Sequence, residues 1–95
     1  MKIKFIQLNL HKSSKANAEI SSWLADGQDR VALCQEPGYN KGKLKNIFPN
    51  IKTFMANLTN PEEKIRACIL IKSDRLKPFK LAQFCDKDQV AVLLN

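Results

Sequence analysis

The spacing of hydrophobic residues changes along the first third of the chain, from the pattern of a strand to that of a helix. Residues 2–10, KIKFIQLNL, are rich in β-forming side chains and predict a strand. Residues 15–26 then predict a helix, with Ser13 or Ser14 as its N-cap and Gly27 just past its end. Its apolar face is formed by Ala16, Ile20, Trp23 and Leu24.

A second strand is predicted over residues 31–36, directly after this helix. Strand, helix and strand in close succession form a βαβ unit, in which the two strands run parallel through a right-handed crossover. Whether the two strands are immediate neighbours is left open by the sequence.

The remainder of the chain predicts short strands separated by polar segments. A lysine-rich loop over residues 38–46 and a turn over 57–64 lie between them. The predicted strands are 52–56, 66–72, 80–85 and 89–94. The last two form an antiparallel hairpin around Asp86-Lys87-Asp88. The chain is therefore predicted to be α/β, with a βαβ unit followed by a β-meander in one domain, residues 1–95.

Charge and composition narrow the classes of partner. The chain has 95 residues and a formal net charge of +7, which favours a polyanion such as nucleic acid or an anionic membrane surface. No apolar run approaches the ~20 residues of a membrane span, and the N-terminus lacks the features of a secretory signal. We therefore expect an intracellular protein that is not secreted. Cys34, Cys68 and Cys85 are expected to be reduced thiols packed in apolar surroundings.

The second strand ends in an unusual way, because four apolar residues lead directly into Gln35, Glu36 and Pro37. Asn9 occupies the corresponding place near the end of the first strand. Ligands of open α/β sheets collect beyond the carboxyl ends of parallel strands, and Mg²⁺ takes one or two protein carboxylates plus water and phosphate oxygens. Glu36 and Asn9 are thus candidate metal ligands. The alternative is that Glu36 merely ends the strand and is solvated.

The lysine-rich loop is a candidate nucleic-acid contact. Tyr39 could stack on a base, while Lys41, Lys43 and Lys45 could neutralise phosphates. An ordinary solvated loop is the alternative. Arg66, at the start of a strand, could face phosphate or form a structural pair with Glu62 or Glu63.

Four segments together resemble a known family: QLNLHKSSKANAEI, ALCQEP, IRACILI and FCDKDQVAVLL. They resemble the N-terminal part of the endonuclease domain of non-LTR retrotransposons. That domain belongs to the endonuclease/exonuclease/phosphatase superfamily, with apurinic/apyrimidinic endonucleases and deoxyribonuclease I. The resemblance covers essentially the whole chain, and its most specific elements are Gln7-x-Asn9 and Gln35-Glu36-Pro37.

The resemblance implies the N-terminal half of a four-layer αββα sandwich and a phosphodiesterase that uses Mg²⁺ or Mn²⁺ to nick DNA. The resemblance implies that Glu36 is a metal-binding catalytic residue. Asn9 is the catalytic residue near the metal and the scissile phosphate. In the parent protein, nicking would prime reverse transcription. The partners implied are DNA, the C-terminal half of the domain and a reverse transcriptase, in the nucleus.

The chain also departs from the family, because its Asp-x-Asn and its terminal Ser-Asp-His have no counterpart after Glu36. His11, the single histidine, is assigned to the rim beside Asn9. We therefore expect a fragment that binds DNA weakly, without sequence specificity, and does not cut it by itself. Two other readings remain: a non-enzymatic basic nucleic-acid-binding module, and a phospholipid or inositol-phosphate phosphodiesterase of the same superfamily.

Overall fold

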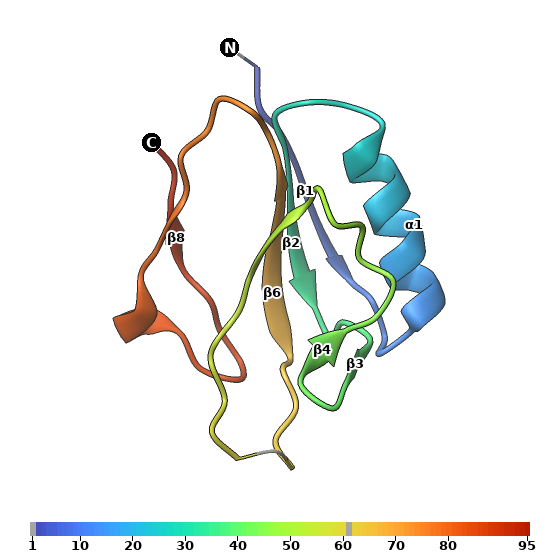
Figure 1. The fold of residues 1–95 in the computed structure, drawn as a ribbon, viewed down its shortest axis with the longest axis vertical. Coiled ribbons are helices and arrows are strands. Elements are labelled where there is room, and N and C mark those ends of the chain that lie inside the picture. The colour runs from blue at the N-terminus through green and yellow to red at the C-terminus, as the bar shows by residue number, and fades with distance from the viewer. Residues whose placement is uncertain (1, 61) are drawn as a thin grey trace.

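A computed structural model describes residues 2–60 and 62–95 and contains a mixed four-stranded sheet with one helix against it (Figure 1). The strand order is β1-β2-β6-β5, with β1 and β2 parallel and β6 antiparallel to both of its neighbours. The bounds of these strands are Lys4–Asn9 for β1, Arg30–Gln35 for β2, Lys52–Phe54 for β5 and Ala67–Lys72 for β6.

The βαβ unit predicted from the hydrophobic pattern is present, and its two strands are immediate neighbours. Helix α1 spans Ser14–Ala25, and Ser13 is its N-cap, since its Oγ accepts a hydrogen bond of 3.1 Å from the amide of Ala16. Asp26 is the C-cap, so Gly27 occupies the position expected for it.

The two faces of the sheet carry separate hydrophobic clusters, because side chains alternate between faces along each strand. Figure 1 shows α1 on one side of the sheet and β8 on the other. The cluster on the helix side contains Leu10, Ile20, Leu24, Ala32, Cys34, Ile51, Cys68 and Leu70. The cluster on the opposite side contains Val31, Ile69, Ile71 and Leu76, with Val90, Val92 and Leu94 packed against it.

The predicted β-meander is wrong. Strand β6 lies between β2 and β5, while β7 (Phe79–Lys80) and β8 (Val92–Leu93) form a separate two-stranded sheet. The physical reason is that β6 is buried at every position up to Ile71, so it takes a central place covered on both faces. Where residues 80–85 predicted a strand, the chain forms a short 3₁₀ helix, η1, over Ala82–Phe84.

The lysine-rich segment is a short hairpin and not a loop. Strand β3 (Tyr39–Asn40) pairs with β4 (Lys43–Leu44) around a turn in which Lys41 and Gly42 have φ angles of 50° and 83°. Two left-handed residues in a two-residue turn are typical of tight β-hairpins. The pattern did not reveal the hairpin because each strand is only two residues long.

A buried asparagine holds this hairpin against the helix. The side-chain amide of Asn17, a fully buried residue of α1, donates hydrogen bonds of 2.9 Å and 2.7 Å to the carbonyls of Gly38 and Lys45. Its Oδ1 accepts a third, of 2.9 Å, from the amide of Gly38. Asn17 thus satisfies backbone groups at both ends of the hairpin.

Two of the three cysteines lie in the core as expected. Cys34 and Cys68 are buried opposite each other on β2 and β6, whereas Cys85 is half-buried, and all three are free thiols. Across the described residues, no helix has the length and apolar character needed to cross a membrane.

Candidate functional site

The carboxyl ends of β1 and β2 meet at one rim of the sheet, as the sequence predicted. Asn9 is in register with Gln35, and the amide of Leu10 donates a hydrogen bond of 2.8 Å to the carbonyl of Gln35. The amide of Lys12 donates another, of 2.7 Å, to the carbonyl of Glu36. Asn9 and Glu36 therefore lie at neighbouring strand ends.

Glu36 has a backbone conformation that is uncommon for a residue with a side chain. Its φ angle is 49°, in the left-handed region, and its amide donates a hydrogen bond of 2.9 Å to the carbonyl of Arg66. His11 and Lys12, across the rim, are left-handed as well, with φ angles of 51° and 59°. Non-glycine residues in this region cost energy and cluster at functional sites. The half-buried Glu36 is thus held between two segments of backbone.

Asn9 is exposed at the same rim. Its Oδ1 accepts a hydrogen bond of 2.7 Å from the amide of His11, which closes a local turn after β1. His11 is exposed, in keeping with its assignment to the rim. A carbonyl oxygen has a second lone pair, so this hydrogen bond leaves Asn9 able to contact another ligand.

Arg66 pairs with neither of the glutamates expected for it. Its Nε donates to a carboxylate oxygen of Asp88, with both side chains about half exposed. Asp88 raises the pKa of Arg66 through this hydrogen bond, and Glu36 adds a smaller attraction. The amide of Arg66 also donates a hydrogen bond of 2.6 Å to the carbonyl of Lys87. The turn between β7 and β8 is thereby attached to the rim beside Glu36.

A small cavity surrounds Glu36. Its volume is about 160 Å³, and its lining consists of Lys12, Glu36, Pro37, Tyr39, Lys64, Ile65 and Arg66. Three of these side chains are cations. The structure thus brings Glu36, Tyr39 and Arg66 together, and it adds two lysines that the sequence analysis missed. No local signal marks Lys12 or Lys64, because each reaches Glu36 only through tertiary structure.

The remaining predicted nucleic-acid contacts lie on the hairpin beside this cavity. Lys41, Lys43 and Lys45 are all exposed. Lys45 and Tyr39 border a second hollow of about 360 Å³, and the rest of its lining is Lys12, Ser14, Gly38, Asn40 and Asn46. Lys12 and Tyr39 line both spaces, so the two adjoin.

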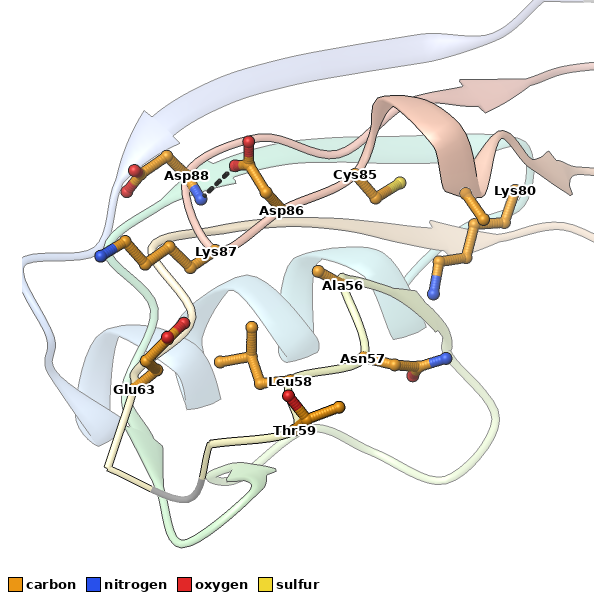
Figure 2. Close-up of a pocket in the computed structure, with 11 residues that line it drawn as sticks. Ala56, Asn57, Leu58, Thr59, Glu63, Lys80, Cys85, Asp86, Lys87 and Asp88 are labelled. Atoms are coloured by element: carbon orange, nitrogen blue, oxygen red, sulfur yellow. Dashed lines mark hydrogen bonds between the residues drawn. The ribbon is translucent and has the colours of Figure 1, made fainter.

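A larger hollow, of about 520 Å³, lies between the segment that follows β5 and the turn between β7 and β8 (Figure 2). Its lining mixes cations with carboxylates, and Figure 2 shows Lys87 and Glu63 at one end and Lys80 at the other. Asp86 already has hydrogen-bond partners within its own turn, because its Oδ1 accepts hydrogen bonds of 2.8 Å and 3.0 Å from the amides of Asp88 and Gln89. This balance of charge favours no single class of ligand.

The donor atoms at the rim suit a hard cation bound mainly through water. No group of three or more Asp, Glu, His or Cys side chains with metal-binding geometry occurs in the described parts of the chain. Glu36 and Asn9 offer a carboxylate and an amide oxygen, which are ligands of the type that Mg²⁺ takes alongside water and phosphate oxygens. These two oxygens are therefore of the chemical type that Mg²⁺ or Mn²⁺ binds.

No protein-family model matches the chain, and no curated protein matches it in sequence. Among solved structures, the endonuclease domain of TRAS1, a telomere-specific non-LTR retrotransposon, superposes with a TM-score of 0.68. This chain has the fold of part of that endonuclease domain. The match covers 99% of this chain and 39% of that chain, at 18% sequence identity. The predicted resemblance and the α/β fold class are therefore confirmed at the level of the fold.

Proposed function

We propose that the chain is the N-terminal part of a divalent-metal-dependent DNA endonuclease of the non-LTR retrotransposon type, and that by itself it does not cut DNA. One observation carries the proposal. In a chain with the fold of part of such a domain, Glu36 and Asn9 lie at adjacent ends of two parallel strands. That is where α/β sheets bind their ligands.

Glu36 and Asn9 would hold the metal, Mg²⁺ or Mn²⁺. When bound, the metal would polarise a phosphoryl oxygen and stabilise the charge that develops on it. The residues of the chain supply the remaining contacts of this corner. The carboxylate of Glu36 attracts the cation, and Arg66 presents a guanidinium to phosphate.

The described residues offer no free acid in a position to act as general base. Asp88 is paired with Arg66, and Asp86 is hydrogen-bonded within its own turn. Glu62 and Glu63 lie outside the cavity around Glu36. Hydrolysis of a phosphodiester requires that the attacking water be oriented and deprotonated. This chain spans 39% of the matched domain. We therefore assign nicking, the reverse transcriptase partner and the nuclear location to the proposed parent protein.

DNA contact is assigned to the exposed lysines of the hairpin, Lys41, Lys43 and Lys45, with Tyr39 at its base. The support is the net charge of +7 and the closeness of these three exposed lysines along residues 41–45. A non-enzymatic nucleic-acid-binding module would use the same surface, so DNA binding alone does not separate the two functions.

The test is a supercoiled-plasmid nicking assay in Mg²⁺ or Mn²⁺, run with the wild-type chain and with Glu36→Gln. We expect no nicking above background from either protein. Mn²⁺ binding, measured in parallel, should be present in the wild type and lost in Glu36→Gln. Robust nicking by the wild type that disappears in Glu36→Gln would overturn the inactive-fragment part of the proposal. Equal Mn²⁺ binding by both proteins would overturn the metal part.

A further inference from the structure

We infer that the cavity around Glu36 binds a phosphate group of a nucleic acid strand directly, through Lys12, Lys64 and Arg66, without any divalent cation. The identity of the strand rests on the proposed function, whereas the phosphate contact itself does not. Neither Lys12 nor Lys64 was predicted from the sequence as a site residue. Neither is one of the two proposed metal ligands, Glu36 and Asn9.

The balance of charge favours an anion. In the described part of the cavity lining, three cationic side chains face a single carboxylate, that of Glu36. Counting Asp88, which pairs with Arg66 from outside the lining, three cations still face two carboxylates. A pocket with an excess of cations raises the local concentration of phosphate. The pairing with Asp88 uses only Nε of Arg66, which leaves its other N–H donors for a ligand.

Backbone hydrogen bonds tie Lys12 and Arg66 to Glu36. The amide of Lys12 donates to the carbonyl of Glu36 at 2.7 Å, and the amide of Glu36 donates to the carbonyl of Arg66 at 2.9 Å. Lys64 and Arg66 flank Ile65, which is buried with 2% of its surface exposed. Alternate residues of an extended chain point to the same side, so burial of Ile65 directs both cations outward. The backbone at Lys12 and Arg66 is therefore ordered before any phosphate binds.

The size of the cavity selects a phosphate over a whole nucleotide. Sites for drug-sized ligands typically have about 300–1,000 Å³, whereas this cavity has about 160 Å³. The adjoining hollow of about 360 Å³ shares Lys12 and Tyr39 with it and includes Lys45. A strand with one phosphate beside Glu36 would therefore continue into that hollow, with Tyr39 between successive units as a stacking surface.

The experiment uses EDTA-treated protein, so that no divalent cation is present. Inorganic phosphate is titrated at constant ionic strength and followed by ¹H–¹⁵N NMR. A short single-stranded DNA with a 5′-phosphate, and the same DNA without it, are titrated next. We expect shifts of the amides of Lys12, Glu36 and residues 64–66, and tighter binding of the phosphorylated DNA.

The variant Lys12→Ala/Lys64→Ala should bind phosphate at least about five-fold more weakly. Both side chains are exposed, so the fold should persist. The control Lys52→Ala/Lys77→Ala removes the same charge from exposed positions outside both cavities and should bind as the wild type does. Glu36→Gln should bind phosphate about three-fold more tightly, because it removes a repelling charge.

Equal phosphate binding by the wild type and the Lys12→Ala/Lys64→Ala variant would overturn the inference, as would binding that appears only after Mn²⁺ is added. Failure of the metal proposal is a separate result. If Glu36→Gln binds Mn²⁺ as well as the wild type does, the metal corner is refuted while the phosphate pocket stands. If inorganic phosphate binds but neither DNA shifts the amides of Lys12, Glu36 and residues 64–66, the assignment to nucleic acid is wrong.

Discussion

Glu36 combines a left-handed backbone, half-burial and a position where two parallel strands end. A residue that merely ended a strand could be solvated without any of these features. Arg66 and Lys12 are attached to its backbone, so the strained conformation is maintained by its neighbours. At this scale the site is a single carboxylate surrounded by cations, which is why we expect its metal affinity to be weak.

Replacing Glu36 by Gln should abolish measurable Mn²⁺ binding at low ionic strength. The amide keeps the size of the side chain but removes the charge that attracts the cation, and Asn9 alone supplies only a neutral oxygen. Paramagnetic broadening of amide signals near Glu36 measures this binding. Glu19→Gln, on the exposed face of α1, is the matched control. Broadening that is the same in all three proteins would remove Glu36 from the role.

A second carboxylate, Asp29, matters for stability and not for binding. Its two oxygens accept hydrogen bonds of 2.6 Å from the hydroxyl of Ser73 and 2.8 Å from the guanidinium of Arg75. The Ser73 hydrogen bond, followed by that of Arg75, lowers the pKa of Asp29 below its ordinary value of 3.8. A depressed pKa contributes stability above the unfolded-state value, and this contribution is lost as the pH falls through the folded-state value.

The wild type should therefore lose stability on acidification below about pH 4. Asp29→Asn should be less stable than the wild type at pH 7 and should show a smaller loss between pH 5 and pH 2. Urea unfolding at a series of pH values measures both effects. Asp26→Asn, exposed at the end of α1, serves as the control. Parallel stability profiles for the wild type and Asp29→Asn would contradict the assignment.

At the scale of elements, the β3–β4 hairpin depends on α1 for its position. Two-residue strands are far too short to be stable alone. The three hydrogen bonds from the side chain of Asn17 supply what the hairpin lacks. Ser21, also buried on α1, donates a hydrogen bond of 3.1 Å to the carbonyl of Asn46 just after the hairpin. The element proposed to contact DNA is therefore positioned by buried polar residues of α1.

Asn17→Ala should destabilise the chain by about 1–3 kcal/mol, because the backbone N–H of Gly38 and the carbonyl of Lys45 lose their hydrogen-bond partner. Hydrogen exchange at the amide of Gly38 should accelerate more than exchange in β6. Urea unfolding gives the first quantity and NMR the second. Ser22→Ala, an exposed position on the same helix, should change little. If exchange in the hairpin is unaffected, Asn17 does not hold it.

The hairpin lysines should determine how DNA binding depends on salt. With about three phosphate contacts on duplex DNA, log K should fall with log salt at a slope near −3. Lys41→Ala/Lys43→Ala/Lys45→Ala should flatten that slope. Fluorescence anisotropy with labelled duplex DNA measures it.

The control for this experiment removes three exposed lysines at other places, Lys4, Lys52 and Lys77. It has the same net charge as the hairpin variant, so it separates local contacts from the overall charge of the molecule. Matching slopes for the two triple variants would refute the assignment to the hairpin.

For the whole molecule, the notable feature is apolar surface on the side of the sheet away from α1. Ile6 and Leu8 of β1 pack on the helix side, so Phe5 lies on the opposite face, where it is 57% exposed. Phe79 on β7 and Leu93 on β8 are 65% and 55% exposed. Large exposed apolar patches favour association.

We therefore expect the chain to self-associate as its concentration rises. Covering an exposed phenylalanine contributes about 1.5–3 kcal/mol, so Phe5→Ser/Phe79→Ser should shift the chain towards monomer. Analytical ultracentrifugation over a range of concentrations measures this. Phe48→Ser, beside the hairpin, is the control. A wild type that stays monomeric at every concentration would contradict the expectation.

The local sequence pattern determined the elements whose stability is local. The helix, a serine cap at position 13 or 14, both parallel strands and β6 follow from the spacing of apolar residues and from capping chemistry. The same pattern placed Asn9 and Glu36 at strand ends, and the quoted segments already indicated an endonuclease-like fold.

Tertiary structure alone decided which segments become neighbours. It placed β6 beside β2 and paired Arg66 with Asp88. It also fixed the hairpin to α1 through Asn17 and brought Lys12 and Lys64 into the cavity around Glu36. The physical reason is that periodicity reports which side of an element is buried but not what covers it. Strand pairing and ion pairing between distant residues depend on how complete faces pack, and that is settled only when the whole chain folds.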